Sequence, residues 1–521
     1  MNLKLGFILS LLTIACSPKK ADETLAIFKY NESAGVSSLD PAFAKDQANV
    51  WVVAQLFNGL VQLDKDLKVQ PAIAKSWNVS KDIRTYTFNL RNDILFHKHT
   101  LLEEKNRRVN AHDFVYSFNR LTDPKVASPG AWVMNNVESY KALNDSVFKI
   151  TLKTPFPPFL GLLSMPYFSV VPQEIIETTN FRDHPIGTGP FQFQYWKDNV
   201  KLVLRKNPHY FENGIPKLDA VSISFIKDKQ AAFLAFLKGD LDFISGLDAS
   251  YKDEVLTKSG NLQPTYQDKI VMQSQPYLNT EYLGFLMDDS NLSFTQKKAV
   301  RKAINYGFDK GKMITYLRNN IGVPATKGFV PIGLPSFTEN LEGYHYDPKK
   351  AKKILSDAAI PRGVEIVLST TSSYLDICEF IQNQIQEIGI NIEIEVNPPS
   401  THRQMVATSK LDFFRGSWIA DYADAENYLA LFYSKNFCPQ GPNYTHFSNE
   451  EFDRLYELAI QEVNDSSRFL LYQQMDQLIL DEAAVVPLYY DQTVRFVQLN
   501  IHHFESNGMN MLNLKNVKKI N

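Results

Sequence analysis

Apolar and polar residues alternate between the period of a strand and the period of a helix along the whole 521-residue chain. Polar and apolar residues alternate one by one in 85–90 (TYTFNL) and in 147–152 (VFKITL), which is typical of half-buried strands. In 111–121 the apolar residues recur at 111, 114, 115, 118 and 121, the spacing of one helical face. This mixture predicts an α/β protein in which helices cover sheets.

Capping and breaking residues set the limits of further elements. Asp347 is a natural N-cap before Pro348, and Gly239 and Gly389 stop the helical patterns that precede them. No sequence repeat occurs, and no long linker separates independent domains. We therefore expect lobes formed by a chain that crosses back and forth. The expected helices are 230–238, 348–359, 375–388, 425–433, 447–463 and 466–483, and the expected strands include 391–396, 485–490 and 494–497.

The amino terminus has the pattern of an export signal. Lys4 precedes an apolar run of about 11 residues, which is too short to span a bilayer and suits the core of a signal peptide. The end of this run, 12–16 (LTIAC), resembles the lipobox of bacterial lipoproteins, although Thr13 stands where Leu is usual. That resemblance implies a signal peptide at 1–15, a lipidated Cys16, a polar tether over 16–23, and a periplasmic protein anchored in the cell envelope. An ordinary secretory signal with an incidental Cys16 is the alternative.

Composition narrows the class of protein. Hydrophobic residues at 44% and charged residues at 21% are ordinary globular values. Lys and Arg (55) nearly balance Asp and Glu (57), so no basic excess favours nucleic-acid binding. The Cys residues at 16, 378 and 438 are odd in number and far apart, which argues against a disulfide scaffold or a cysteine zinc site. Cys378 and Cys438 are expected either to pair or to remain buried single thiols.

Sequence patterns for catalysis are absent. The chain has no G-x-S-x-G, H-E-x-x-H, C-x-x-C or G-x-x-x-x-G-K-[ST] motif. His97 and His99 with His112 are a conceivable metal site, but a loop of solvated histidines is the favoured interpretation. Asp424 is explained as the N-cap of the helix at 425–433, whereas Asp421 needs another explanation. We therefore predict a protein that is not an enzyme and has no cofactor and no metal.

A series of short segments resembles one known family. In chain order they include 38–42 (SLDPA), 55–60 (QLFNGL), 71–77 (PAIAKSW), 86–91 (YTFNLR), 111–120 (AHDFVYSFNR), 127–129 (ASP), 187–191 (GTGPF), 207–211 (NPHYF), 239–242 (GDLD), 300–304 (VRKAI), 346–355 (YDPKKAKKIL) and 416–424 (GSWIADYAD). Together they are similar to the family 5 extracytoplasmic solute-binding proteins, the receptors of oligopeptide and dipeptide ABC transporters.

The resemblance implies a three-lobed fold of the periplasmic-binding-protein type, with two main lobes that close about a hinge and an inserted lobe. Lobe one is expected at 24–57, 186–272 and 489–521, lobe two at 58–185 and lobe three at 273–488. The ligand is expected to be buried between lobes one and three.

The resemblance also implies ligand contacts. In the family the Asp of a W-x-x-D segment pairs with the α-ammonium group of a peptide, and here that residue is Asp421, after Trp418. Arg415 corresponds to an Arg that can pair with a peptide carboxylate. The stretches expected to flank the ligand as strands are Lys45, Asp46 and Gln47 on one side and Ser417, Trp418 and Ile419 on the other. Trp418 is also interpretable as core, and Arg415 as part of a salt bridge within its lobe.

Two departures from the family pattern stand out. After 127–129 the oligopeptide receptors carry a Tyr near the ammonium site, where this chain has Gly130, with Trp132 following. The basic and acidic stretch at 97–110 replaces a short turn of the family.

The resemblance implies that the protein is a monomeric receptor. Its expected function is to deliver peptides to the permease subunits of an ABC importer in the inner membrane. The alternatives are the same fold binding a nickel chelate, an oligosaccharide, haem or a cell-wall peptide, since fold does not fix ligand. An enzyme of cell-wall or glycan turnover is a more distant alternative.

Overall fold

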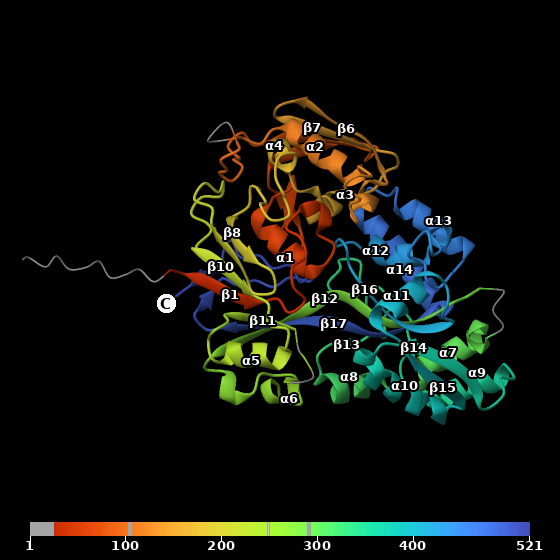
Figure 1. The fold of residues 1–521 in the computed structure, drawn as a ribbon. Helices are drawn as coiled ribbons and strands as arrows, with labels where there is room; N and C mark the ends of the chain where they lie inside the picture. Colours follow the sequence, from red (N-terminus) through yellow and green to blue (C-terminus); the bar gives the residue numbers. More distant parts are fainter. Residues whose placement is uncertain (1–24, 103–106, 247, 249–250, 289–292, 521) are drawn as a thin grey trace, which may run out of the picture.

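In the computed structural model, the residues described are 25–102, 107–246, 248, 251–288 and 293–520. The expected signal peptide at 1–15, Cys16 and the whole expected tether at 16–23 lie outside the described residues. Figure 1 shows two long strands, β12 (Ile270–Phe285) and β17 (Val485–Gln498), running across the middle of the molecule. They pair antiparallel over most of their length, so the two sides of the molecule share one sheet.

The large sheet has eleven strands, in the order β15-β14-β16-β12-β17-β11-β1-β10-β9-β8, with β13 paired to β17. On one side of β12 and β17 it contains β14 (Val364–Thr370), β15 (Ile390–Val396) and β16 (Phe413–Ile419), with β13 (Val323–Pro324) beside β17. On the other side it contains β1 (Ile27–Asn31), β8 (Phe191–Lys197), β9 (Lys201–Lys206), β10 (Ala220–Ser224) and β11 (Phe243–Ser245).

A separate antiparallel sheet of four strands lies at the top of Figure 1, in the order β4-β5-β7-β6. Its strands are β4 (Ala74–Val79), β5 (Thr85–Leu90), β6 (Val137–Asn144) and β7 (Val147–Leu152). In β5 and β7 every second residue is buried, as the alternating sequence predicts. Two short antiparallel pairs complete the described strands: β2 (Val61–Leu63) with β3 (Val69–Pro71), and β18 (Ile501–His502) with β19 (Lys518–Lys519).

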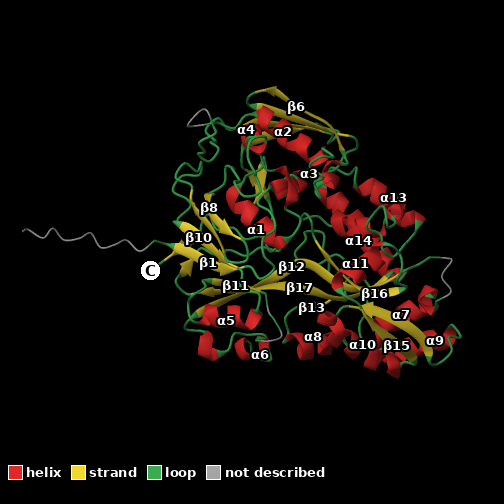
Figure 2. Ribbon diagram, in the orientation of Figure 1, coloured by secondary structure: helices red, strands yellow, loops and turns green. Residues whose placement is uncertain are grey.

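Helices cover both sheets (Figure 2). The first half of the chain contributes α1 (Gln47–Leu56), α2 (Ala111–Thr122), α3 (Phe159–Leu162), α4 (Gln173–Ile176), α5 (Lys229–Leu237) and α6 (Lys252–Val255). The second half contributes α7 (Lys298–Gly307), α8 (Lys310–Arg318), α9 (Pro348–Asp357), α10 (Leu375–Glu387), α11 (Pro399–Ala407), α12 (Glu426–Leu429), α13 (Glu450–Ala459) and α14 (Asp465–Asp481). Short 3-10 turns include η2 (Ala131–Met134) and η3 (Pro166–Phe168).

Local signals place several helix starts. Asp347 accepts a hydrogen bond from the amide of Lys350 and Pro348 begins α9, as expected. Asn110 and Asp113 form a reciprocal capping box at the start of α2. The expectation of two strands at 485–490 and 494–497 is wrong: β17 runs as one strand through the polar residues between them. Gln492 and Thr493 pair with β12, and the register shifts between Gln492 and Tyr490.

The hydrophobic core clusters can be compared with the expected lobe boundaries. One cluster contains both Phe28 of β1 and Phe148 of β7, so the expected lobes one and two share a core. The region 273–488 supplies most of two further clusters, one around Leu283 and Ile381 and one around Tyr428 and Met475, and all of a small cluster around Tyr344 and Leu480. The expected boundaries near 272 and 488 fall inside β12 and β17. The lobe boundaries stay a prediction.

Candidate functional site

A cavity of about 690 Å³ is lined by residues of α1 and, far from them in the chain order, by residues of the turn that follows β16. Its size is that of a small-ligand pocket. Its lining comes from segments far apart in the chain: residues near 44–72, 129–132 and 164–169, Tyr277 on β12, 419–421 after β16, and 507–515 near the carboxyl terminus. The lining is therefore assembled by the tertiary structure.

Lys45, Asp46 and Gln47 line this cavity at the start of α1. Asp46 is the N-cap of the helix: its Oδ1 accepts a hydrogen bond of 3.0 Å from the amide of Asn49, and its Oδ2 lies 3.4 Å from the Asn49 amide nitrogen Nδ2. One function of the Asp46 carboxylate is thus to hold the helix end that faces the cavity.

Asp421 lines the cavity from the opposite side, in the turn that follows β16. Asn427 donates a 3.4 Å hydrogen bond to its Oδ2, and the Asp421 amide donates to Asn427 Oδ1 at 3.1 Å. Burial raises the pKa of Asp421, an effect that Asn427 partly offsets. Among the described residues no Lys, Arg or His forms an ion pair with this carboxylate. A partly buried carboxylate without a cation is suited to a cationic ligand group.

In the strand before Asp421, some residues line the cavity and others pack against the core. Ile419 lines the cavity and is 48% exposed. Trp418 packs against the core cluster around Tyr428, and its Nε1 donates a 3.0 Å hydrogen bond to Asn427 Oδ1. Trp418 and Ser417 pair with β12 and are not part of the cavity lining. Trp418 therefore supports Asn427, which in turn holds Asp421.

Arg415 has a partner within its own side of the molecule. Its guanidinium forms a buried ion pair with Glu281 of β12, and its Cζ lies 3.2 Å from the ring centroid of Tyr374. The Arg415 and Glu281 side chains are only 10% and 4% exposed. Burial raises the pKa of Glu281 and Arg415 counteracts this shift. Arg415 does not line the cavity in this conformation, and its role as a carboxylate partner stays a prediction.

Aromatic and thioether side chains that the sequence did not identify complete the lining. They are Trp51, Tyr167, Tyr277, Met165, Met509 and Met511. No local motif marks them, because they reach the cavity from four separate segments of the chain. Trp132, which the departure at Gly130 brought to notice, also lines the cavity and is 40% exposed.

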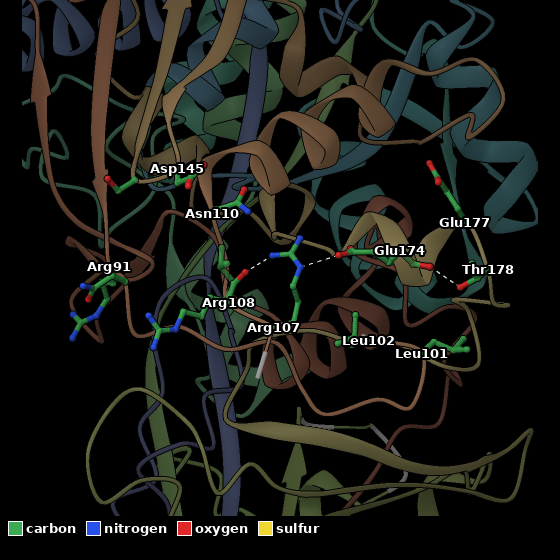
Figure 3. Close-up of a pocket in the computed structure, with 13 residues that line it drawn as sticks. Arg91, Leu101, Leu102, Arg107, Arg108, Asn110, Asp145, Glu174, Glu177 and Thr178 are labelled. Carbon is green, nitrogen blue, oxygen red and sulfur yellow. Dashed lines mark hydrogen bonds and ion pairs between the residues drawn. The ribbon is translucent and has the colours of Figure 1, made fainter. Parts of the chain in front are cut away.

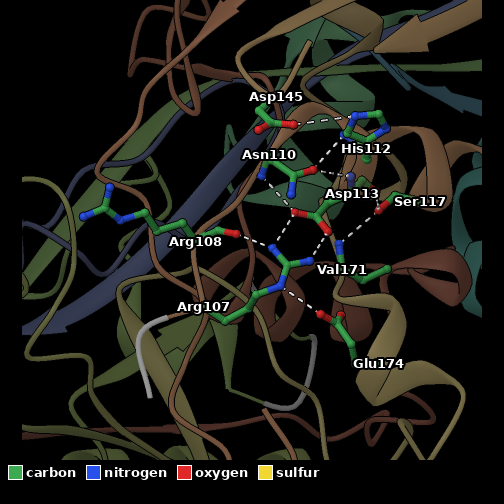
Figure 4. A network of polar contacts seen from close by, with 9 residues as sticks. All are labelled: Arg107, Arg108, Asn110, His112, Asp113, Ser117, Asp145, Val171 and Glu174. Carbon is green, nitrogen blue, oxygen red and sulfur yellow. Dashed lines mark hydrogen bonds and ion pairs between the residues drawn. The ribbon is translucent and has the colours of Figure 1, made fainter. Parts of the chain in front are cut away.

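A second cavity, of about 790 Å³, lies beside the stretch 97–110 and shares no lining residue with the first (Figure 3). Its centre is Arg107, whose Nη2 lies 2.6 Å from Asp113 Oδ1 and whose Nε donates a 2.8 Å hydrogen bond to Glu174 Oε1 (Figure 4). Asn110 and Asp113 are also bound to each other in the capping box of α2. These polar groups have partners already, so the arrangement is explained by the stability of this helix start.

Burial and contacts test the two interpretations of the histidines, a metal site or a solvated loop, and the two interpretations of Cys378 and Cys438, a disulfide or single thiols. The solvated-loop interpretation is wrong for His97, which is buried: its Nε2 lies 3.0 Å from the Gly189 carbonyl oxygen, and burial lowers its pKa to about 4. Cys378 and Cys438 are both free and buried. Within the described part of the chain no group of three or more His, Cys, Asp or Glu side chains is placed to hold a metal ion.

No helix among the described residues combines the length and the apolar character needed to cross a membrane.

Comparisons with known proteins agree with this arrangement. The glutathione-binding protein GsiB of Salmonella choleraesuis is 26% identical over 479 residues, covering 90% of each chain. The dipeptide-binding protein DppE of Bacillus subtilis is 25% identical over 517 residues, covering 92% of this chain and 89% of the relative. The structure of the periplasmic binding protein DppA from Helicobacter pylori in complex with the peptide STSA superposes with a TM-score of 0.78, at 26% identity, covering 95% of this chain and 98% of that one.

Residues 68–437 match the family described as bacterial extracellular solute-binding proteins, family 5. With the shared sheet, the cavity between its two sides and this match, the chain belongs to the family 5 bacterial extracellular solute-binding proteins.

Proposed function

We propose that this protein is an extracytoplasmic receptor that binds peptides in the cavity between its lobes and delivers them to an ABC importer. The observation that carries the proposal is the Asp421 carboxylate, which lines the cavity and has an amide partner but no cation among the described residues. A peptide α-ammonium group taken out of water needs such a partner. The names of the similar proteins, which refer to glutathione, dipeptides and a bound peptide, support this ligand class.

Calorimetric titration tests the ammonium contact. The probes are di-alanine, tri-alanine, Ser-Thr-Ser-Ala and reduced glutathione, and the N-acetylated form of each peptide that binds. A charge-assisted hydrogen bond contributes about 1.5–3 kcal/mol, so Asp421→Asn is expected to weaken binding at least about tenfold. Acetylation is expected to cause a comparable loss in the wild type and a much smaller one in the variant, because both changes remove one interaction.

Asp412→Asn is the matched control, since Asp412 lies on the same side of the molecule, is exposed and does not line the cavity. This substitution is expected to leave affinity unchanged. Equal affinity of the wild type for free and acetylated peptides would contradict the ammonium contact and would favour a non-peptide solute.

Lobe closure about β12 and β17 is the second part of the proposal. These strands are the long continuous connections between the two sides of the sheet, and the cavity lies between those sides. A bound peptide that contacts both sides favours the closed state. At a concentration of 100 times the dissociation constant the peptide should stabilise the protein by about 2.7 kcal/mol. Small-angle scattering should show a smaller radius of gyration with peptide; an unchanged radius contradicts hinge closure.

The third part concerns location and assembly. We propose that Cys16 carries a lipid anchor, that 16–23 is a tether, and that the protein acts as a monomer facing permease subunits of the inner membrane. The lipobox-like segment at 12–16 supports the anchor. Cys16→Ser should move the protein from the membrane fraction into the soluble envelope fraction, because acyl chains provide about 0.8 kcal/mol per buried CH₂. A wild type already found only in the soluble fraction contradicts the anchor.

A further inference from the structure

Gly130 is in contact with the ring of Tyr167. A Cβ added at Gly130 would lie 2.5 Å from Cε1 and 2.7 Å from Cγ of this ring, far closer than real Cβ contacts. The backbone of Gly130, with φ −86° and ψ 3°, is open to other residues. The absence of a side chain at Gly130 is therefore needed for the close approach of the Tyr167 ring and not for the backbone conformation.

Tyr167 occupies the space that Gly130 leaves. It lies in η3 and packs in the core cluster that contains Phe28 and Phe148, yet it also lines the cavity together with Asp421 and Asp46. Its hydroxyl has no hydrogen-bond partner among the described residues. Burial and then the charges of Asp421 and Asp46 raise its pKa to about 12.

An ammonium group has three N–H donors, and each needs an acceptor when the group is buried. Asp421 already accepts a hydrogen bond from Asn427 through Oδ2. A phenolic hydroxyl can accept a hydrogen bond from a cation and donate one to a carboxylate. A hydroxyl without a partner, in a cavity with two carboxylates, fits that role.

We propose that Tyr167 is a specificity-determining residue of the ammonium subsite: its hydroxyl accepts a hydrogen bond from the ligand's α-ammonium group beside Asp421, and Gly130 makes room for its ring. This inference rests on the proposed peptide-binding function, whose failure the experiment below distinguishes. The signal in the sequence is the departure at Gly130, and the compensating residue lies in a different segment, at 167.

The experiment measures, by calorimetry with the same peptide probes, the ratio of affinities for free and N-acetylated forms. Tyr167→Phe keeps the ring and removes the hydroxyl. It is expected to weaken binding of the free peptide about tenfold or more and to leave binding of the acetylated form unchanged, so that the ratio falls. Tyr195→Phe, at an exposed tyrosine that does not line the cavity, is the control and should preserve the ratio.

Gly130→Ala tests the packing half of the inference. The added methyl should displace the Tyr167 ring and lower the same ratio. In a Tyr167→Ala background it should have little further effect, because the ring it displaces is gone. Gly161→Ala is the matched control: a Cβ there meets no atom within 4 Å, and the residue lies in the nearby α3. Unfolding curves of each variant identify any that fail to fold; Tyr167→Phe, which retains the packing ring, is the deciding variant.

The outcomes separate the two proposals. If the wild type binds none of the probes, the peptide-binding function is overturned and this inference with it. If the wild type binds and Asp421→Asn weakens binding, but Tyr167→Phe leaves the free-to-acetylated ratio unchanged, only the role of Tyr167 is overturned.

Discussion

Two charged residues of one short segment, Arg415 and Asp421, have opposite environments. Arg415 lies within β16, is paired with Glu281 and is covered by the ring of Tyr374. Asp421 lies just beyond the end of the same strand, faces the cavity and has Asn427 as its partner. A charge with a counter-ion inside the protein stabilises a particular arrangement of strands, whereas a charge that lacks a counter-ion at a cavity is available to a ligand. The difference teaches that charge and sequence spacing alone do not identify a ligand contact.

The largest effect on stability is expected at the Arg415 ion pair. Arg415→Met leaves the Glu281 carboxylate buried without its cation, which costs about 3–5 kcal/mol. Glu281→Gln together with Arg415→Met should recover most of this loss, because no buried charge remains. Urea unfolding at pH 7 measures both variants. Wild-type stability of Arg415→Met would show that Glu281 does not depend on this guanidinium.

A third acidic residue nearby, Glu426, extends the comparison. It is buried and accepts hydrogen bonds from the hydroxyls of Tyr422 and Tyr456, and burial raises its pKa to about 7. A carboxyl whose pKa is higher in the folded than in the unfolded state binds its proton more tightly when folded. The ionisation of Glu426 therefore lowers the stability of the folded protein as pH rises from about 4.5 to about 7, by an amount on the order of a few kcal/mol.

Glu426→Gln should remove this part of the pH dependence, while Glu379→Gln, at an exposed glutamate of α10, should retain it. Unfolding free energies measured from pH 4 to 8 provide the comparison. The same slope in Glu426→Gln and wild type would contradict the assignment to Glu426.

The pH dependence of binding should identify Asp421 as the residue that meets the ligand. Burial raises the pKa of Asp421, so protonation as pH falls begins at a higher pH than for a free aspartate. Below this pKa the affinity for a free peptide should fall by up to about tenfold per pH unit. Titrations at several pH values should show this decline in the wild type and its absence in Asp421→Asn or with acetylated peptide.

The smallest effect is expected for Asp421→Asn without ligand. Because burial disfavours the ionised carboxylate in the folded state, its removal at pH 7 should leave stability unchanged or raise it by less than about 1 kcal/mol. Asp412→Asn is again the control. A loss of several kcal/mol in urea unfolding would show that Asp421, like Arg415, is primarily structural.

The sequence alone determined most of the local structure. The alternation in 85–90 and 147–152 agrees with β5 and β7, and Asp347 with Pro348 begins α9 as expected. These features depend on side-chain periodicity and on hydrogen bonds within about one turn of helix, and both are encoded by neighbouring residues. The family and its sheet-and-helix class followed from short segments in a characteristic order.

The tertiary structure decided which of the identified residues face the cavity. Arg415 pairs with a glutamate 134 residues away, and the ring of Tyr167 packs over Gly130 from another segment. The sequence predicts two strands where β17 is one, because the polar residues Gln492 and Thr493 pair with Pro276 and Gln275 of the distant β12. Partners, burial and cavity lining depend on which distant segments meet, and no local pattern of side chains carries that information.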